Sequence, residues 1–255
     1  MTGCLGVGAS AAKNIAAALN KPLVGVHHMQ AHALTALLTS PPADLPSFPF
    51  LTLLVSGGHT LLLLATSLTS FRILATTPDE SIGRVFDKVS RMLTLPWSSL
   101  GPGAALEEFC LPVADEPTHG PDTDELVPPL PIAMPGTLAF SFSGLHSSVE
   151  RFMTSHGGSE ALDVGTKRAL ARAFQRAAVG QLEDKVALAL KWCARKGFDN
   201  ASPDLPMSLV FPPPSLCTDN AVMIGWASMH RFLAGDFDEY SIATRPKWSI
   251  EELSS

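Results

Sequence analysis

The sequence predicts an α/β protein with a mixed sheet, because short apolar runs of strand length precede long segments with helical periodicity. Apolar residues 50–55 and 60–65 flank Ser-Gly-Gly-His and predict a β-hairpin, and residues 71–75 predict a third strand. Helical periodicity extends over residues 79–93 and 166–194. A further helix is expected from Asp219 to Phe232.

The N-terminal part predicts a helix, a strand and a second helix. The first helix covers residues 9–19 and should end at Asn20, because Pro22 cannot continue it. Residues 23–26 then predict a short buried strand, and residues 27–38 the second helix.

Two proline-rich segments predict the organisation of the chain. Residues 40–49 contain four prolines and predict a linker, which divides the chain into residues 1–45 and 46–255. Residues 111–135 contain seven prolines and predict a long loop within the second part.

The composition limits the classes of partner and site. A net charge of −6 gives no global basic field for nucleic acid, so such a partner would need a local basic patch or a helper protein. The four cysteines lack CxxC spacing, which argues against a disulfide framework or a thiolate zinc site. Apolar runs are too short to cross a bilayer, so no membrane partner is expected.

A histidine pair is the first candidate metal site. His28 and His32 stand at i and i+4 and therefore share one face of a helix, and Asp219 is the expected third ligand of an open site. Histidines at this spacing also occur on helices that bind no metal. A zincin protease is disfavoured, because the glutamate of H-E-x-x-H is missing: Met29 follows His28.

The hairpin turn is a candidate phosphate site. Gly57 and Gly58 allow a close approach of phosphate to the backbone, while Ser56 and Thr60 offer hydroxyl donors. An ordinary hairpin turn would need only the glycines.

The acids of the 79–93 helix and the aromatic-serine segment at residues 140–145 can each be explained without a functional site. Glu80 and Asp87 fall on about the same helix face and are suited to a ribose hydroxyl or a metal-bound water. Taken alone, these acids are better explained by a solvated helix face with a Glu80–Arg84 pair. Residues 140–145, Phe-Ser-Phe-Ser-Gly-Leu, are compatible with an edge strand and turn.

Taken in order, these motifs resemble the tRNA N6-adenosine threonylcarbamoyltransferase family, once described as O-sialoglycoprotein endopeptidases. The matching segments are Lys21–His28 with His32, Leu53–Thr60, Gly83 with Phe86–Val89, Phe140–Leu145, and Pro213–Pro214 with Cys217–Ala221 and Met223–Ile224. The closing Arg245–Trp248 resembles the bacterial and mitochondrial branch.

The resemblance implies a fold like that of actin, Hsp70 and sugar kinases (the ASKHA fold), with two lobes around a nucleotide. It implies transfer of threonylcarbamoyl from threonylcarbamoyl-AMP to N6 of the adenosine beside the anticodon in tRNAs that read ANN codons. His28, His32 and Asp219 are then metal ligands for iron or zinc, because two imidazoles and a carboxylate do not choose between them.

The same resemblance implies the substrate contacts. The expected contacts are Leu54, Val55, Ser56, Gly57 and Gly58 around the adenylate, Asp87 at the nucleotide sugar, Gly101 or Gly103, and the neighbouring Glu107. A homodimer or accessory subunits are expected as partners, in mitochondria or otherwise in the cytoplasm.

Two departures from the family pattern predict a truncated chain. The family's first hairpin with its phosphate loop has no counterpart here, and residues 196–207 contain no Gly-Gly-Val-x-x-Asn loop. Most of the first lobe is therefore expected to be missing. This predicts weak or no transferase activity for the chain alone, and a partner-binding remnant as the alternative function, with a metallo-endopeptidase last.

Overall fold

A computed structural model describes residues 2–97, 99–112, 127–198 and 208–253. Contacts divide the chain into two compact units. The first unit consists of Met1–Thr52, Leu63–Ile73 and Asn200–Ser255, and the second of Leu53–Leu62 and Leu74–Asp199. Each is described by itself, and the expected lobes 1–45 and 46–255 of the family fold remain a prediction.

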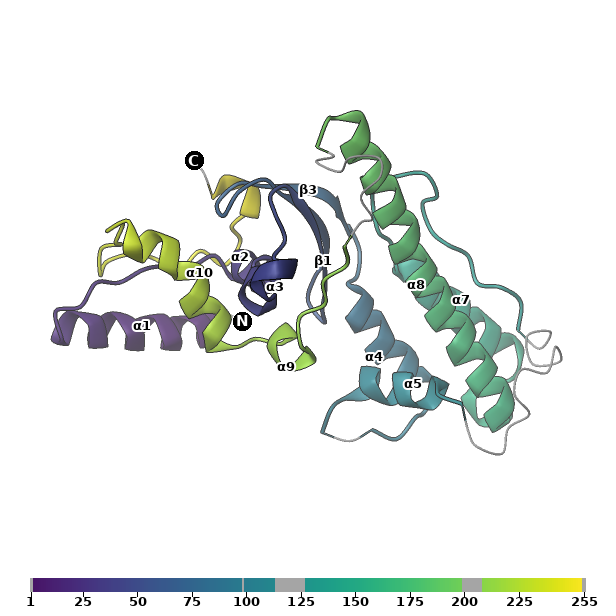
Figure 1. Cartoon of the computed structure of the whole chain (residues 1–255). Coiled ribbons are helices and arrows are strands. Elements are labelled where there is room, and N and C mark those ends of the chain that lie inside the picture. The colour runs from purple at the N-terminus through teal and green to yellow at the C-terminus, as the bar shows by residue number, and fades with distance from the viewer. Residues whose placement is uncertain (1, 98, 113–126, 199–207, 254–255) are drawn as a thin grey trace. The chain divides into compact units, whose positions relative to one another are not determined.

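The first unit contains parts of the three strands (residues 50–52, 63–65 and 71–73) and several helices (Figure 1). The helices are α1 (Thr2–Ala18), α2 (His28–Ala33), α3 (Thr35–Thr39), the 3₁₀ turn η1 (Pro42–Asp44), α9 (Pro214–Cys217), α10 (Ala221–Leu233) and η3 (Ile250–Glu252). Helices α2 and α10 pack together through buried Ala31, Met223 and Ala227, against which Val26 and Ile224 lie.

Helix α1 ends as expected but begins earlier than predicted, at Thr2 rather than residue 9. Asn20 adopts a positive φ of 46°, while Lys21 N–H donates to Ala16 O and Asn20 N–H to Ala17 O. This pattern is a Schellman motif, in which a left-handed residue satisfies the last helical carbonyls. Helix α1 therefore ends because of the backbone conformation at Asn20, two residues before Pro22.

The single helix expected over residues 27–38 is wrong. It divides into α2 and α3 at Leu34, where ψ is −2°. Thr35 Oγ1 donates to Ala31 O at 2.9 Å, and Thr39 Oγ1 to Thr35 O at 3.0 Å. Hydroxyl bonds to the preceding turn bend helices, which accounts for the break.

The strand expected over residues 23–26 is also wrong. Only Leu23 pairs, in an isolated antiparallel bridge with Asp238. Gly25 N–H donates instead to the Asp238 carboxylate at 2.6 Å, so a side chain takes the place of a neighbouring strand.

The three predicted strands are confirmed. They are β1 (Phe50–Val55), β2 (Thr60–Ala65) and β3 (Phe71–Thr76), which form a sheet of order β1-β2-β3. Short turns join these consecutive strands, so the sheet of the described residues is antiparallel and the expected mixed sheet is wrong. The β1–β2 turn closes with Ser56 N–H donating to His59 O at 2.9 Å. Strand β2, the central strand, is the most buried, as its apolar run requires.

Helices dominate the second unit. They are α4 (Ile82–Met92), α5 (Pro102–Cys110), α7 (Ser143–Ser155), the 3₁₀ turn η2 (Ser159–Ala161) and α8 (Val164–Arg195). Figure 1 shows α8, in green, beside α7, and α4 beside α5. Helix α8 confirms the long predicted helix, and the Asp163 side chain caps it by accepting from Thr166 N–H at 2.9 Å.

Two expectations about this unit need correction. The helix predicted from Asp79 begins only at Ile82, because the Asp79 side chain binds a distant segment instead of capping the helix. Ser143 to Leu145 are not part of a strand or turn but begin α7. The core beneath these elements includes Phe140, Phe142, Phe174, Leu170, Val85 and Val89, all fully buried.

Some sequence expectations lie outside the described residues. Most of the proline-rich loop (residues 113–126) and most of the segment lacking the glycine-rich family loop (199–207) are among them. None of the helices in the described ranges has both the length and the apolar character needed to cross a bilayer.

Candidate functional site

The three predicted metal ligands converge. His32 Nε2 lies 3.0 Å and His28 Nε2 3.2 Å from the same oxygen, Asp219 Oδ1. The two imidazole rings meet edge to face with centroids 4.7 Å apart. The ligand atoms of all three residues lie within 4.8 Å of one another. One point in space can therefore be reached by two nitrogens and an oxygen.

The ends of two helices place these ligands. His28 and His32 lie on α2, whose N-cap is His27: its Nδ1 accepts from Gln30 N–H at 3.4 Å. Asp219 immediately precedes Asn220, whose side chain caps α10 by accepting from Met223 N–H at 2.9 Å. Because α2 packs on α10, the two helix starts meet.

The C-terminal segment holds the start of α2. His27 Nε2 lies 2.9 Å from Trp248 O, and the two rings are 4.9 Å apart. Burial lowers the pKa of His27, and the hydrogen bond to the Trp248 carbonyl offsets this only in part. A neutral His27 with Nε2–H donating to Trp248 and Nδ1 accepting from Gln30 satisfies both contacts.

A carboxylate and a guanidinium fix the residues just before α2. Asp238 accepts from Gly25 N–H, and Arg231 donates to Asp238 Oδ2 at 2.9 Å and to Gly25 O at 3.0 Å. Arg231 also binds Asp236. These charge-assisted bonds join residues far apart in the sequence and orient the helix that bears the two histidines.

The donor set fits a divalent ion. In a tetrahedral zinc site with bonds of about 2.0–2.2 Å, ligand atoms lie about 3.3 Å from one another, close to the separations here. The His28 and Asp219 side chains are 44% and 79% exposed, so a substrate or water can reach the remaining position. An open site with three protein ligands is the arrangement of catalytic rather than structural metal centres.

The glycine turn, Ser56–His59, packs against the start of α4. Ser81 Oγ donates to Gly57 O at 2.7 Å, and Ile82 N–H to Thr60 Oγ1 at 3.0 Å. A Cβ added at Gly83 would lie 2.8 Å from Ser56 O. Gly83 is therefore required by this close approach, and the turn lies where the positive end of the helix dipole favours an anion.

Within the turn, Ser56 organises the backbone. Its Oγ accepts from Gly58 N–H at 3.2 Å and from His59 N–H at 3.0 Å. Ser56, Gly57 and Gly58 are all exposed, as is Val55 at the end of β1, whereas Leu54 is half-buried. The predicted substrate loop is thus a preformed and accessible turn.

Two of the predicted substrate contacts, Asp87 and Gly103, are hydrogen-bonded to each other. Asp87 Oδ1 accepts from Gly103 N–H at 2.9 Å. Gly101 has a φ of 93° and caps α5, so its left-handed backbone favours glycine. Glu107 lies further along α5, exposed, beside a small hollow with Leu100 and Leu111. Gly103 therefore has a contact with Asp87 that neither Gly101 nor Glu107 shows.

The helix-face pair expected between Glu80 and Arg84 is wrong. Glu80 precedes the helix and pairs with Lys88. Residues outside a helix do not follow its i, i+4 geometry, so the prediction failed with the helix start.

The contacts of Asp79, which lies close to the residues that touch the glycine turn, were not expected from the sequence. Its carboxylate accepts from Ser143 Oγ at 2.6 Å, Ser141 Oγ at 2.7 Å and Thr77 Oγ1 at 2.7 Å. Partial burial opposes ionisation, but the hydrogen bonds from Ser143, Ser141, Thr77 and Glu80 outweigh it and lower the pKa of Asp79. The sequence feature that could have indicated these contacts is the pair of serines in Phe-Ser-Phe-Ser, whose hydroxyl groups need a hydrogen-bond acceptor.

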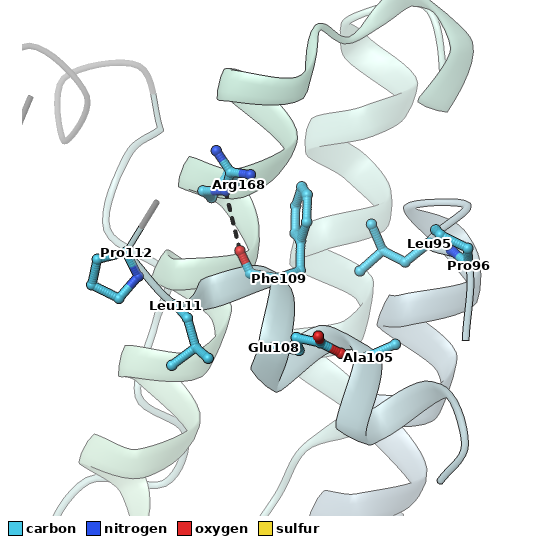
Figure 2. A pocket seen from close by; sticks show the side chains of 8 residues that line it. All are labelled: Leu95, Pro96, Ala105, Glu108, Phe109, Leu111, Pro112 and Arg168. Atoms are coloured by element: carbon cyan, nitrogen blue, oxygen red, sulfur yellow. Dashed lines mark hydrogen bonds between the residues drawn. The ribbon is translucent and has the colours of Figure 1, made fainter. Parts of the chain in front are cut away.

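A pocket in the described part of the second unit lies elsewhere. Figure 2 shows this open pocket of about 460 Å³, where Arg168 Nε donates to Phe109 O at 3.2 Å. Its lining is Leu95, Pro96, Ala105, Glu108, Phe109, Leu111, Pro112 and Arg168. None of the predicted site residues lines it, so it is not the predicted substrate site.

Comparison with known proteins gives one consistent result. Residues 1–226 match the profile of the family described as tRNA N6-adenosine threonylcarbamoyltransferase. The chain is 34% identical over 284 residues to the mitochondrial enzyme of that name from Schizosaccharomyces pombe, and covers 65% of it. That alignment includes 99% of the chain.

Two further relatives bear the same name. The protein of Bartonella bacilliformis is 34% identical over 280 residues, with 99% of this chain and 72% of the relative covered. A probable mitochondrial enzyme of Arabidopsis thaliana is 34% identical over 289 residues, with 98% and 57% covered. The chain thus spans 57% to 72% of the length of these relatives.

Proposed function

Because the chain belongs to the tRNA N6-adenosine threonylcarbamoyltransferase family, we propose that it takes part in that modification. The amine N6 of a tRNA adenosine beside the anticodon attacks the carbonyl carbon of threonylcarbamoyl-AMP. A C–N bond forms, the C–O bond to phosphate breaks, AMP leaves, and N6 loses a proton. The substrates are threonylcarbamoyl-AMP and tRNAs that read ANN codons.

The convergence of His28, His32 and Asp219 is the observation that supports this function most directly. These residues would hold one divalent ion, iron or zinc, whose bound form supplies Lewis-acid polarisation of an acyl or phosphoryl oxygen. The Nε2 atoms that face Asp219 Oδ1 would be the imidazole donors, and the carboxylate would lower the net charge of the site. The exposure of Asp219 leaves access for the substrate.

The glycine turn and Asp87 are proposed to hold the adenylate. Ser56, Gly57 and Gly58 are exposed beside the start of α4, where backbone and hydroxyl groups suit a phosphate, with Leu54 and Val55 flanking them. Asp87 would accept a ribose hydroxyl through the oxygen that does not bind Gly103. Gly101 and Gly103 would let the nucleotide approach α5, with Glu107 beyond them.

The remaining proposals follow the family and its relatives. Homodimerisation or accessory subunits would supply contacts outside this chain, including the basic surface for tRNA that a net charge of −6 does not offer globally. The two relatives named as mitochondrial support a mitochondrial location. The names of the relatives favour a transferase over a partner-binding remnant or a peptidase.

A direct assay tests the function. The purified chain, loaded with iron(II) or zinc, is incubated with threonylcarbamoyl-AMP and an unmodified tRNA that reads an ANN codon. Nucleosides are then separated by chromatography with mass detection. Because the chain alone is expected to have weak or no activity, threonylcarbamoyladenosine should form with the wild type when an accessory extract is added, and not with Asp219→Ala. Absence of product with every metal, with or without an accessory extract, would refute the proposal.

A further inference from the structure

The Asp79 carboxylate connects residues 77–80 with the serine segment, residues 141–143, in the second unit. Its Oδ1 accepts from Thr77 Oγ1, from Glu80 N–H at 2.6 Å and from Phe142 N–H at 3.2 Å. Its Oδ2 accepts from Ser141 Oγ, Ser143 Oγ and Ser143 N–H, the last at 3.3 Å. Residues more than 60 positions away in the sequence are thus bound to this single carboxylate.

The serine segment is held in place by buried contacts. The fully buried Gln181 of α8 accepts from Ser141 N–H at 2.7 Å and donates to Ser141 O at 2.9 Å. Phe140 and Phe142, on either side of Ser141, are fully buried. Asp79 therefore binds a segment that α8 and the buried phenylalanines already hold in place.

The residues that follow Asp79 contact the glycine turn and the strand after it. Two residues after Asp79, Ser81 Oγ donates to Gly57 O, and Ile82 N–H donates to Thr60 Oγ1. Gly83 then packs directly on Ser56 and Gly57. These contacts between the start of α4 and the hairpin are made by Ser81, Ile82 and Gly83, which follow Asp79 closely in the sequence.

We infer that Asp79 is a positioning residue for the adenylate-binding turn, because it fastens the segment supporting Ser56–His59 to the serine segment and α8. This inference rests on the proposed function for the role of the turn. Asp79 itself need not touch the nucleotide. Its contribution is to fix the backbone on which Gly57 and Gly58 are presented.

The contacts require a carboxylate rather than an amide. All of the groups that face Asp79 are donors, and three of them are backbone N–H groups that cannot reverse their role. An asparagine of the same shape would direct an NH₂ group at one set of these donors. The lowered pKa of Asp79 agrees with a carboxylate that stays charged at neutral pH.

Hydrogen exchange of the free chain tests the connection without any nucleotide. In Asp79→Asn, the amides of His59 and Ile82 should exchange about tenfold faster, the effect expected when charge-assisted bonds in a local opening unit are lost. Asp163→Asn is the matched control: Asp163 also accepts from a threonine hydroxyl and an N–H, but it caps α8. Unchanged exchange in Asp79→Asn would overturn the inference.

Binding of AMP then tests the functional consequence. Calorimetry should show an AMP Kd that is at least about tenfold higher in Asp79→Asn, near the wild-type value in Asp163→Asn, and intermediate in Asp79→Glu. Equal affinity of Asp79→Asn and wild type would overturn the positioning role. If the wild type does not bind AMP, the proposed function of the turn fails, and the exchange experiment alone decides whether Asp79 positions it.

Discussion

His32 Nε2 lies 3.0 Å from Asp219 Oδ1, although 187 positions separate the two residues. Packing of α2 against α10 makes this approach, and the contact belongs wholly to the first unit. The three predicted ligands of the metal centre therefore all lie in the first unit.

Removing one histidine should abolish stoichiometric metal binding. His32→Ala leaves only His28 and Asp219, and loss of a ligand should weaken binding by more than the 10–100-fold typical of an outer-shell partner. Metal content after dialysis, measured by mass spectrometry, checks this. His156→Ala is the control, because His156 belongs to the second unit, stacks on Phe152 and is not among the three converging residues. Equal metal content in both variants would contradict the ligand assignment.

Gly83→Ala should disturb the glycine turn. The new Cβ would lie 2.8 Å from Ser56 O and 3.0 Å from Gly57 Cα, so the backbone must move, at a cost of about 1–3 kcal/mol. Urea unfolding measures the loss. Gly144→Ala, in α7 with nothing within 4 Å of the added carbon, should instead be neutral or stabilising. Similar unfolding midpoints for the two variants would exclude the close approach.

Lys185→Met should destabilise the segment before the buried phenylalanines. The Lys185 side chain is fully buried, and its Nζ donates to Met134 O at 2.7 Å and pairs with Asp184. Methionine keeps the volume but removes the bonds of Nζ to Met134 O and to the Asp184 carboxylate, whereas Met134 O still accepts from Thr137. Loss of these charge-assisted bonds costs about 1–3 kcal/mol. Lys191→Met, at an exposed position of the same helix, should change the unfolding free energy by less than about 0.5 kcal/mol.

Cys110 should resist alkylation at pH 8. Burial raises the pKa of this thiol to about 11, although Arg172, Arg168 and Arg176 act in the opposite direction. Because the thiolate is the reactive form, labelling of Cys110 by iodoacetamide should accelerate only as the pH approaches that value. Peptide mapping should show the exposed Cys4 and Cys217 labelled first at pH 8. Simultaneous labelling of all three would argue against the buried environment.

Local patterns were sufficient for much of the fold. Apolar runs on both sides of Ser56–His59 predict a hairpin because strand and turn chemistry act over a few residues, and α8 follows from long periodicity. The start of α4 was wrong because Asp79, a good capping residue, binds Ser141 and Ser143 instead. Propensity cannot anticipate a competing partner that arrives from a distant segment.

The sequence by itself determined the hairpin, the long helix, the family resemblance and the pairing of His28 with His32 as candidate metal ligands. It did so because each depends on residue types at short, readable spacings. Only the tertiary structure decided that His28 and His32 aim at one oxygen of Asp219, and that Asp79 joins the glycine turn to α8. Those contacts depend on how helices pack, and packing brings together side chains that no local pattern relates.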